Sequence, residues 1–277
     1  MNKQEGAGRT ALVTGASAGL GAEFARQLAA RGFDLILTAR REDRLTELAR
    51  EIEAKSGVAI AVIPADLADP AAPGHLVADI AARGLTVDVL VNNAGYGIAD
   101  IYERTAWEAQ RDLLQVLVTA VAELTHRLLP GMLDRRFGRI VNVASLAAFA
   151  PAVPGATLYA GAKAFVLRFS EFLAAEVEGR GVHVLVTCPG FTRTEFHAAA
   201  SMTQATDTIP DWQWQSAEAV VREALDTVMA GRGPVLVNGM VNRFAAGLLK
   251  YLPGGVIRQI AARHPLARRA RADARSS

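Results

Sequence analysis

The chain has 277 residues, 51% of them hydrophobic, which is enough for a sizeable core in one large α/β domain or two small ones. Its net charge of +2 favours no nucleic acid or other charged partner, and its single cysteine, Cys188, excludes an internal disulfide and fits a reducing compartment. The first residues lack the apolar segment of a signal peptide, and no uninterrupted apolar run reaches the roughly 18 residues of a membrane-spanning helix. We therefore expect a soluble cytoplasmic protein.

Short apolar runs alternate with longer helical patterns along the chain. Strands are expected at residues 10–14, 34–40, 58–66, 87–95, 139–145, 182–188 and 234–237. Helices are expected at 23–31, 43–55, 71–83, 107–132, through Tyr159 to about 179, and at 217–229. Buried strands alternating with helices predict a doubly wound, seven-stranded parallel α/β sheet of the Rossmann-like type. Ligands bind such sheets beyond the carboxyl ends of the strands.

A glycine-rich segment, T-G-A-S-A-G-L-G, follows the first expected strand. Gly15, Gly19 and Gly21 would allow a tight turn and close approach of a pyrophosphate to the N-terminus of the next helix. The spacing differs from the common G-x-G-x-x-G fingerprint and lacks the G-K-[ST] ending of a nucleotide-triphosphate loop. A turn that serves only packing is the alternative.

Residues at the ends of the second and third expected strands are candidates to bind the adenosine half of a dinucleotide. Ala39 stands where an acidic residue would bind a ribose 2′-hydroxyl, and Arg40 and Arg41 follow it, which favours the 2′-phosphate of NADP(H). Ser17 would add a hydroxyl. The alternative is a solvated charged run that opens a helix. Asp66, followed by Leu67, would hold the adenine amino group or cap a helix.

Tyr159 and Lys163 stand four residues apart in a segment expected to be helical, so their side chains would be neighbours. One interpretation is an amphipathic helix with two polar tips. The other is a phenol acid whose pKa is lowered by the adjacent ammonium group.

Five motifs occur in one order at the expected strand ends: the glycine-rich loop, N-N-A-G at 92–95, Ser145, Y-x-x-x-K at 159–163 and P-G-x-x-x-T at 189–194. Together they resemble the short-chain dehydrogenase/reductase family in its single-domain form, over residues 10 to about 237. The resemblance implies an NADP(H)-dependent oxidoreductase that interconverts a ketone or aldehyde and its alcohol. It also implies a homodimer or homotetramer.

The resemblance assigns a role to each motif. Tyr159 would be the acid/base, and Lys163 and the oxidised nicotinamide would lower its pKa. Ser145 would orient the carbonyl oxygen, and Lys163 would bind the nicotinamide ribose. The implied cofactor-binding residues are Gly15, Ser17, Gly19, Leu20, Gly21, Arg40, Arg41, Asp66, Leu67, Asn93, Ala94, Gly95, Tyr159, Lys163, Pro189, Gly190, Thr192 and Thr194.

Leu117 departs from the family pattern. The alignment of L-P-G-M at 129–132 places it where the family has an asparagine that holds a water connected to the lysine. Either water and backbone replace that side chain, or Gln115 or Thr119 does, or the register is different.

The remaining features bear on substrate and partners. The five histidines show no ligand spacing, so no metal site is expected. A fairly hydrophobic carbonyl or alcohol is the expected substrate, because aromatic residues lie where the family has its substrate loop. The alternative is that these aromatic residues are ordinary core. The expected pocket residues are Tyr96, Leu146, Phe149, Val153, Phe191, Phe196, Trp212 and Trp214.

Residues 242–277 form a basic, amphipathic extension to the expected catalytic domain at 1–241. The extension contains eight lysines or arginines and one aspartate, a local charge of +7, so the remaining 241 residues carry −5. We favour an extra helix with a frayed basic end. Contact with another subunit, cover of the active site, or contact with an anionic membrane are the alternatives.

Two other functions stay open at this point. One is a non-catalytic NADP(H)-sensing protein on the same fold, which Leu117 supports and the intact Ser145, Tyr159 and Lys163 oppose. The other is a membrane-associated reductase of lipids or steroids.

Overall fold

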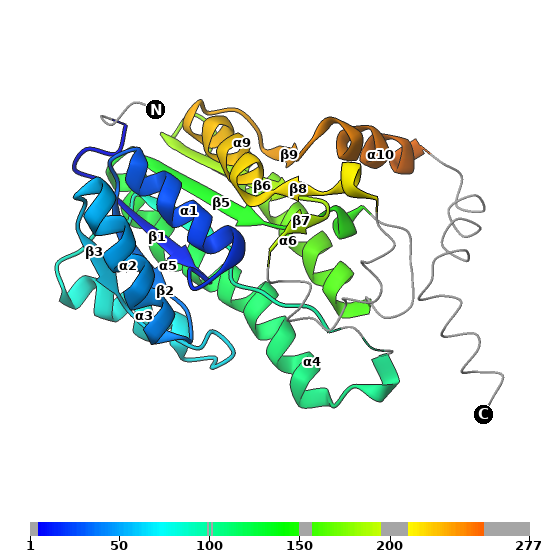
Figure 1. Cartoon of the computed structure of the whole chain (residues 1–277), viewed down its shortest axis with the longest axis horizontal. Helices are drawn as coiled ribbons and strands as arrows, with labels where there is room; N and C mark the ends of the chain where they lie inside the picture. The colour runs from blue at the N-terminus through cyan, green and yellow to red at the C-terminus, as the bar shows by residue number, and fades with distance from the viewer. Residues whose placement is uncertain (1–4, 99, 101, 150–156, 195–209, 252–277) are drawn as a thin grey trace.

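The computed structural model describes residues 5–98, 100, 102–149, 157–194 and 210–251. At its centre lies a seven-stranded sheet in the order β3-β2-β1-β4-β5-β6-β9, with every neighbouring pair parallel (Figure 1). The predicted doubly wound sheet is confirmed. The strands are β1 Thr10–Thr14, β2 Asp34–Thr38, β3 Ile60–Val62, β4 Val89–Asn92, β5 Gly138–Val143, β6 Val182–Cys188 and β9 Val235–Val237.

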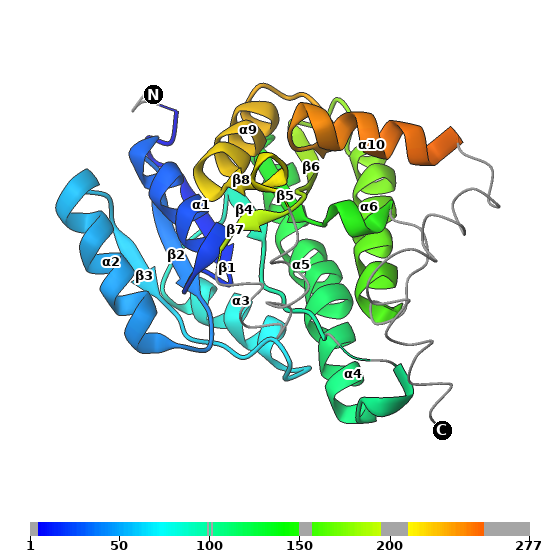
Figure 2. The same ribbon diagram turned by 45° about the vertical axis from the view of Figure 1, so that its right-hand side comes forward.

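Helices cover both faces of the sheet (Figures 1 and 2). One face carries α1 Gly19–Ala30, α2 Glu42–Ser56 and α9 Ala217–Met229, and the other carries α3 Ala72–Ala82, α4 Trp107–Leu114, α5 Ala120–Asp134 and α6 Thr157–Glu176. Both faces need cover because successive side chains of β1 point to opposite faces of the sheet. Ala11 and Val13 join the core under α1 and α2, whereas Leu12 between them joins the core under α3 and α5.

Four expected strands end earlier than predicted. The apolar pattern placed strands at 34–40, 58–66, 87–95 and 139–145, but the observed strands end at residues 38, 62, 92 and 143. At β4 the reason is clear: the backbone N–H groups of Asn93 and Ala94 donate to the side-chain hydroxyl of Thr14 on β1, and not to a backbone carbonyl of a neighbouring strand. The chain therefore leaves the sheet where the site begins.

Other differences concern short or irregular elements. Helix α1 begins at Gly19, not at residue 23, so the last two glycines of the loop lie in its first turn. A second, two-stranded sheet pairs β7 Thr192–Arg193 with β8 Gln215–Ser216, and elements of this length leave no periodic signal. Three 3₁₀ helices, η1 Tyr102–Arg104, η3 Leu146–Ala148 and η4 Asp211–Gln213, were also not expected.

The long helix predicted at 107–132 is interrupted by a π-helical turn. Helices α4 and α5 are joined by η2, Gln115–Thr119, into one continuous run. Within the described residues, Trp107–Asp134 is the single helical run with the length and composition to cross a membrane. Leu113, Leu117 and Leu124 are each only 1% exposed and pack in the core, as the side chains of a soluble core helix do.

The extension begins as a helix, as predicted. Helix α10, Met240–Tyr251, starts just after β9, at the carboxyl edge of the sheet (Figures 1 and 2). The remainder of the extension lies outside the described residues.

Candidate active site

The glycine-rich loop is tightly packed against the end of β4. Gly15 has a φ of +65°, and a Cβ placed on it would lie 2.8 Å from the Ala94 Cα. A Cβ on Gly21 would lie 2.2 Å from the Gly15 carbonyl oxygen and 2.5 Å from the Asn93 Nδ2. The chain can close this turn only with glycine at both positions.

Asn93 joins the loop to the sheet. Its amide Nδ2 donates to the carbonyl oxygens of Thr14, at 2.9 Å, and of Gly15, at 3.3 Å. Helix α1 then starts from Ala18, which offers no capping side chain, and its first turn contains no acidic residue. The N-terminus of α1 keeps its positive dipole and backbone donors, which are the features that bind a pyrophosphate.

Arg41, rather than Arg40, contacts the glycine-rich loop. An Arg41 guanidinium nitrogen donates to the Ser17 hydroxyl over 3.1 Å, so both candidate phosphate ligands lie together. Arg40 is exposed at the end of β2. The Asp66 Oδ1 accepts from the Ala68 N–H over 3.1 Å, and Leu67 is buried. Asp66 is not the N-cap of α3, which begins after Ala71.

Ser145 and Tyr159 meet beyond the end of β5. Their side chains share a hydrogen bond. The Ser145 hydroxyl oxygen also accepts from the Ala147 N–H at 3.1 Å, and the Leu146 N–H donates to the Pro189 carbonyl at 2.8 Å. These bonds hold the turn after β5 against the turn after β6, and so position the serine.

Lys163 lies one helical turn after Tyr159 on α6, with its Nζ 5.7 Å from the centre of the tyrosine ring. The Nζ donates to the Val143 carbonyl over 2.8 Å. The lysine is only 6% exposed, and burial lowers its pKa from an ordinary 10.5 to about 8. The ammonium group is therefore held at the sheet end in a site that disfavours its charge.

The expected lowering of the Tyr159 pKa by Lys163 and the oxidised nicotinamide stays a prediction, and in the protein alone other groups set the direction of the shift. Burial raises the pKa of the Tyr159 phenol above its ordinary 10, and only the Ser145 hydrogen bond opposes this. The Tyr159 phenol and the Lys163 ammonium group are both shielded from solvent. The ammonium group donates its hydrogen bond to a backbone carbonyl and not to the phenol. The neutral phenol is favoured, which suits a proton donor.

Leu117 lies at the site, as the alignment predicted. It is 1% exposed, and its Cδ2 lies 2.7 Å from where a Gly95 Cβ would be. That same Cβ position is 3.8 Å from the Lys163 Nζ. The side chain therefore faces the lysine end of the site from the π-helical turn. Thr119 is exposed, and the buried Gln115 Nε2 has no partner among the described residues.

A buried polar network beneath the site was not foreseen from the sequence. Asn92 and Asn142 are paired across β4 and β5, and the Asn92 Nδ2 donates to the Asn142 Oδ1 at 2.9 Å and to the Thr125 hydroxyl at 3.1 Å. The Asn142 Nδ2 donates to the Ser170 hydroxyl at 2.9 Å. The network ties the two central strands to α5 and α6. An asparagine inside the apolar strand R-I-V-N-V was the available signal.

The segment after β6 lies against the glycine-rich loop. Thr192 is buried, and its hydroxyl donates to the Gly190 carbonyl over 3.1 Å. The Thr194 Cβ lies 3.3 Å from where a Gly19 Cβ would be. Thr194 therefore faces the glycine-rich loop, which brings two sequence-distant cofactor candidates together.

The expected substrate pocket is found only in part. Phe191 and Trp214 pack with ring centres 5.8 Å apart, and Leu146 and Phe149 are partly buried near Ser145. Trp212 is 66% exposed, and Tyr96 packs against the core under α3 and α5. Val153 and Phe196 lie outside the described residues.

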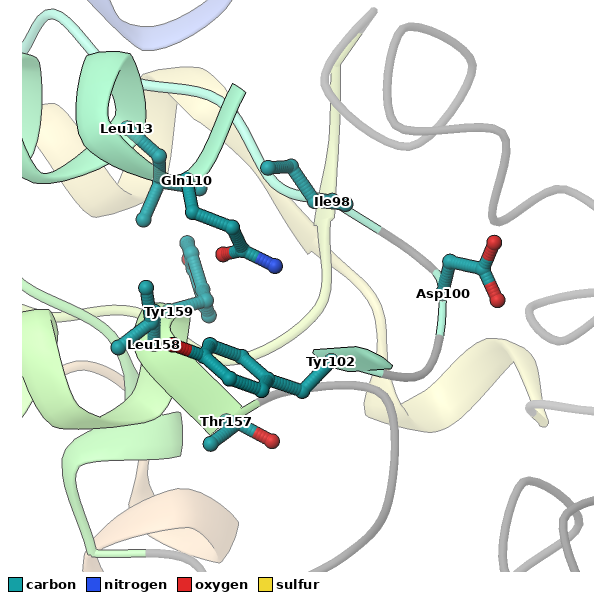
Figure 3. Close-up of a pocket in the computed structure, with 8 residues that line it drawn as sticks. All are labelled: Ile98, Asp100, Tyr102, Gln110, Leu113, Thr157, Leu158 and Tyr159. Carbon is teal, nitrogen blue, oxygen red and sulfur yellow. The ribbon is translucent and has the colours of Figure 1, made fainter. Parts of the chain in front are cut away.

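A small cavity next to Tyr159 has a different lining (Figure 3). Its volume is about 10 Å³, enough for a single water, and the Gln110 amide and the Tyr102 ring both point toward it. Alternation and motif spacing did not identify this wall, because α4 and η1 contribute it from outside the motifs. Its lining residues are Ile98, Asp100, Tyr102, Gln110, Leu113, Thr157, Leu158 and Tyr159.

In the part of the chain that is described, no group of three histidine, cysteine or acidic side chains is placed to hold a metal ion. Cys188 is fully buried, and burial raises the pKa of its thiol to about 12. It behaves as a small core residue.

Comparisons with known proteins agree with this arrangement. The family model described as short chain dehydrogenase matches residues 9–205. A 17-beta-hydroxysteroid dehydrogenase type 3 from Danio rerio is 33% identical over 234 residues, covering 81% of this chain and 71% of that protein. A very-long-chain 3-oxoacyl-CoA reductase from Laccaria bicolor is 40% identical over 183 residues, covering 64% of this chain and 53% of that protein, so the match spans about half of its length.

Solved structures give the same picture. A short-chain dehydrogenase from Sphingobium yanoikuyae, in complex with NADPH, superimposes with a TM-score of 0.78 at 31% identity. The match covers 88% of this chain and 96% of that one.

Proposed function

We propose, from the premise that this chain belongs to the short chain dehydrogenase family, that it is an NADP(H)-dependent carbonyl reductase or alcohol dehydrogenase. The observation that supports this most directly is the arrangement of Ser145, Tyr159 and Lys163 at the carboxyl edge of the sheet, the edge at which the glycine-rich loop also lies. The fold alone would not suffice, since one fold hosts many functions.

The residues at the carboxyl edge of the sheet fit a dinucleotide. Gly15 and Gly21 let the loop close tightly against Ala94 and Asn93, and the uncapped N-terminus of α1 that follows suits a pyrophosphate. Arg41 and Ser17 would hold a 2′-phosphate, and Lys163 would bind the nicotinamide ribose. When bound, the dinucleotide supplies or accepts the hydride.

Tyr159 would move the proton. Its pKa lies above 10 because of burial, so it is a neutral donor at pH 7 and can protonate a carbonyl oxygen as that oxygen gains charge. Ser145 already hydrogen-bonds the phenol, so it would hold the same carbonyl oxygen beside the donor.

We propose a fairly hydrophobic ketone or aldehyde as the substrate. Phe191 and Trp214 support this from the β7–β8 side, and Leu146 and Phe149 from the β5 side. The names of the steroid and oxoacyl-CoA relatives point the same way.

A panel of ketones and alcohols, offered with NADPH and with NADH, tests the function. We expect NADPH-linked reduction of apolar ketones, followed by the loss of nicotinamide absorbance, and NADPH binding measured separately by its fluorescence. Tight binding of NADPH with no turnover across the panel would favour a cofactor-sensing protein instead.

Arg41 and Arg40 provide a test of cofactor preference. Arg41→Asp should lower the NADPH-to-NADH preference by about tenfold or more, because a carboxylate replaces a charge-assisted donor beside Ser17. Arg40→Asp should have a smaller effect in the same direction. Arg50→Asp, an exposed site on α2, is the matched control. Equal preference ratios in all three variants would show that neither arginine reads the phosphate.

Leu117→Asn tests whether the site works without the family's asparagine. We expect turnover that is unchanged or a few-fold higher, with a loss of roughly 2 kcal/mol in the free energy of unfolding, because an amide replaces a packed leucine. Leu124→Asn, equally buried on α5 but away from the motifs, controls for stability. If only the Leu117→Asn protein reduced ketones, the natural chain would be a binding protein.

A further inference from the structure

Helix α10 exposes a cluster of apolar side chains. Met240 is 83% exposed, Val241 51% and Phe244 74%. The described residues include eight exposed large hydrophobic side chains, and three of the eight lie in this span of five residues. Single exposed apolar residues need no explanation, but a cluster on one helix marks an interaction surface.

The orientation of α10 is set by its polar side. The Asn242 Nδ2 donates to the Asn238 carbonyl at 2.8 Å and to the Gln215 side chain at 3.1 Å. Arg243 forms an ion pair with Glu223 and donates to the Val237 carbonyl at 2.9 Å. Ala246 is buried. The helix is thus fastened to β8, β9 and α9, and the apolar cluster faces away from the body.

The chain that follows α10 is cationic. Residues 252–277 contain six arginines and one aspartate: Arg258, Arg263, Arg268, Arg269, Arg271, Arg275 and Asp273. An apolar helix face joined to a run of cations is the composition of segments that lie on anionic bilayers. Each cation near such a surface strengthens partitioning by about fivefold.

A second copy of the chain fits this surface less well. Three side chains offer far less area than the roughly 1,200–2,000 Å² that stable protein interfaces bury. Two adjoining copies would also bring two basic extensions together. We propose that the exposed apolar face of α10 is a peripheral binding surface for anionic phospholipid bilayers, and that the cationic sequence of residues 252–277 adds to the attraction.

This surface lies beside the site. A Cβ on Gly190, in the segment after β6, would meet the Asn242 Nδ2 at 2.5 Å. Helix α10 also begins at the carboxyl edge of the sheet, where Ser145 and Tyr159 lie. Binding through α10 would therefore place the site next to the lipid, where apolar substrates partition. Membrane binding does not depend on the proposed reaction, so an experiment can reject either proposal without rejecting the other.

Vesicle flotation of the full chain tests the proposal. We expect binding to phosphatidylcholine vesicles containing phosphatidylglycerol at least about tenfold stronger than to phosphatidylcholine alone, and weaker at high salt. The double variant Met240→Ser, Phe244→Ser should lose about tenfold in partitioning to the anionic vesicles. Phe172→Ser, which removes a 70% exposed phenylalanine from α6, should change nothing.

A charge variant gives a second, independent arm. Arg268→Gln, Arg269→Gln and Arg271→Gln together should lower binding to anionic vesicles and leave α10 unaltered, with thermal melting as the check on folding. The proposal is overturned if the natural chain does not float with anionic vesicles, or if neither variant weakens flotation. It is also overturned if light scattering shows that Met240→Ser, Phe244→Ser converts an oligomer into a monomer.

Discussion

Replacing Tyr159 by phenylalanine is expected to lower turnover by about 1,000-fold while leaving the affinity for NADPH within a few-fold of that of the natural chain. The phenol is the group placed to donate a proton, and general acid–base groups contribute roughly 10²–10⁴ in rate. The ring itself is retained, so its packing against the core beside α4 should persist. Stopped-time assays of ketone reduction and NADPH fluorescence titration measure the two effects separately.

Two further variants sharpen this test. Ser145→Ala removes the hydrogen-bond partner of the phenol and should lower turnover by a smaller factor, because the proton donor remains. Tyr251→Phe, at the end of α10, is a matched control that should retain full activity. Activity of Tyr159→Phe within a few-fold of the natural chain would contradict its assignment as the acid.

The fold was largely predictable because its signals are long and periodic. Seven apolar runs separated by helical segments predicted the parallel sheet, and the carboxyl ends of those runs located the glycine-rich loop, Ser145 and the 189–194 segment together. The predicted end of β4 was wrong because a side chain competes there for backbone donors. The Thr14 hydroxyl draws the chain out of the sheet after Asn92, and no apolar pattern reports this.

The role of a site residue was predictable from the sequence where the residue type alone determines it. It was not predictable where the role depends on tertiary neighbours. Gly15 and Gly21 follow from a steric rule, but the lowered pKa of Lys163 depends on burial that only the packed structure provides. The Asn92–Asn142 pair requires the register of β4 against β5. The wall that contains Gln110 comes from helix α4, whose distance from the motifs is set by the fold.

Lys163→Met is expected to abolish turnover. The free energy of unfolding at pH 7 should not fall, and should rise somewhat. Burial lowers the pKa of this lysine from 10.5 to about 8, which corresponds to roughly 3 kcal/mol of destabilisation while the group is charged in both states. Methionine removes that charge and fills a similar volume. The hydrogen bond to the Val143 carbonyl, 2.8 Å long, is lost in return and offsets about 1–2 kcal/mol of the gain.

The pH dependence of this difference gives the decisive measurement. Between about pH 8 and 10.5 the unfolded natural chain holds a proton on Lys163 that the folded chain has released, so its stability rises with pH across this window. The variant lacks this contribution. Its advantage in the free energy of unfolding, measured by urea titration, should therefore fall by about 2 kcal/mol between pH 7 and pH 10. A difference that does not change with pH would show that Lys163 is not held in a site that disfavours its charge. If Lys163→Met lost turnover while the stability difference did not change with pH, the lysine would act only through its contacts.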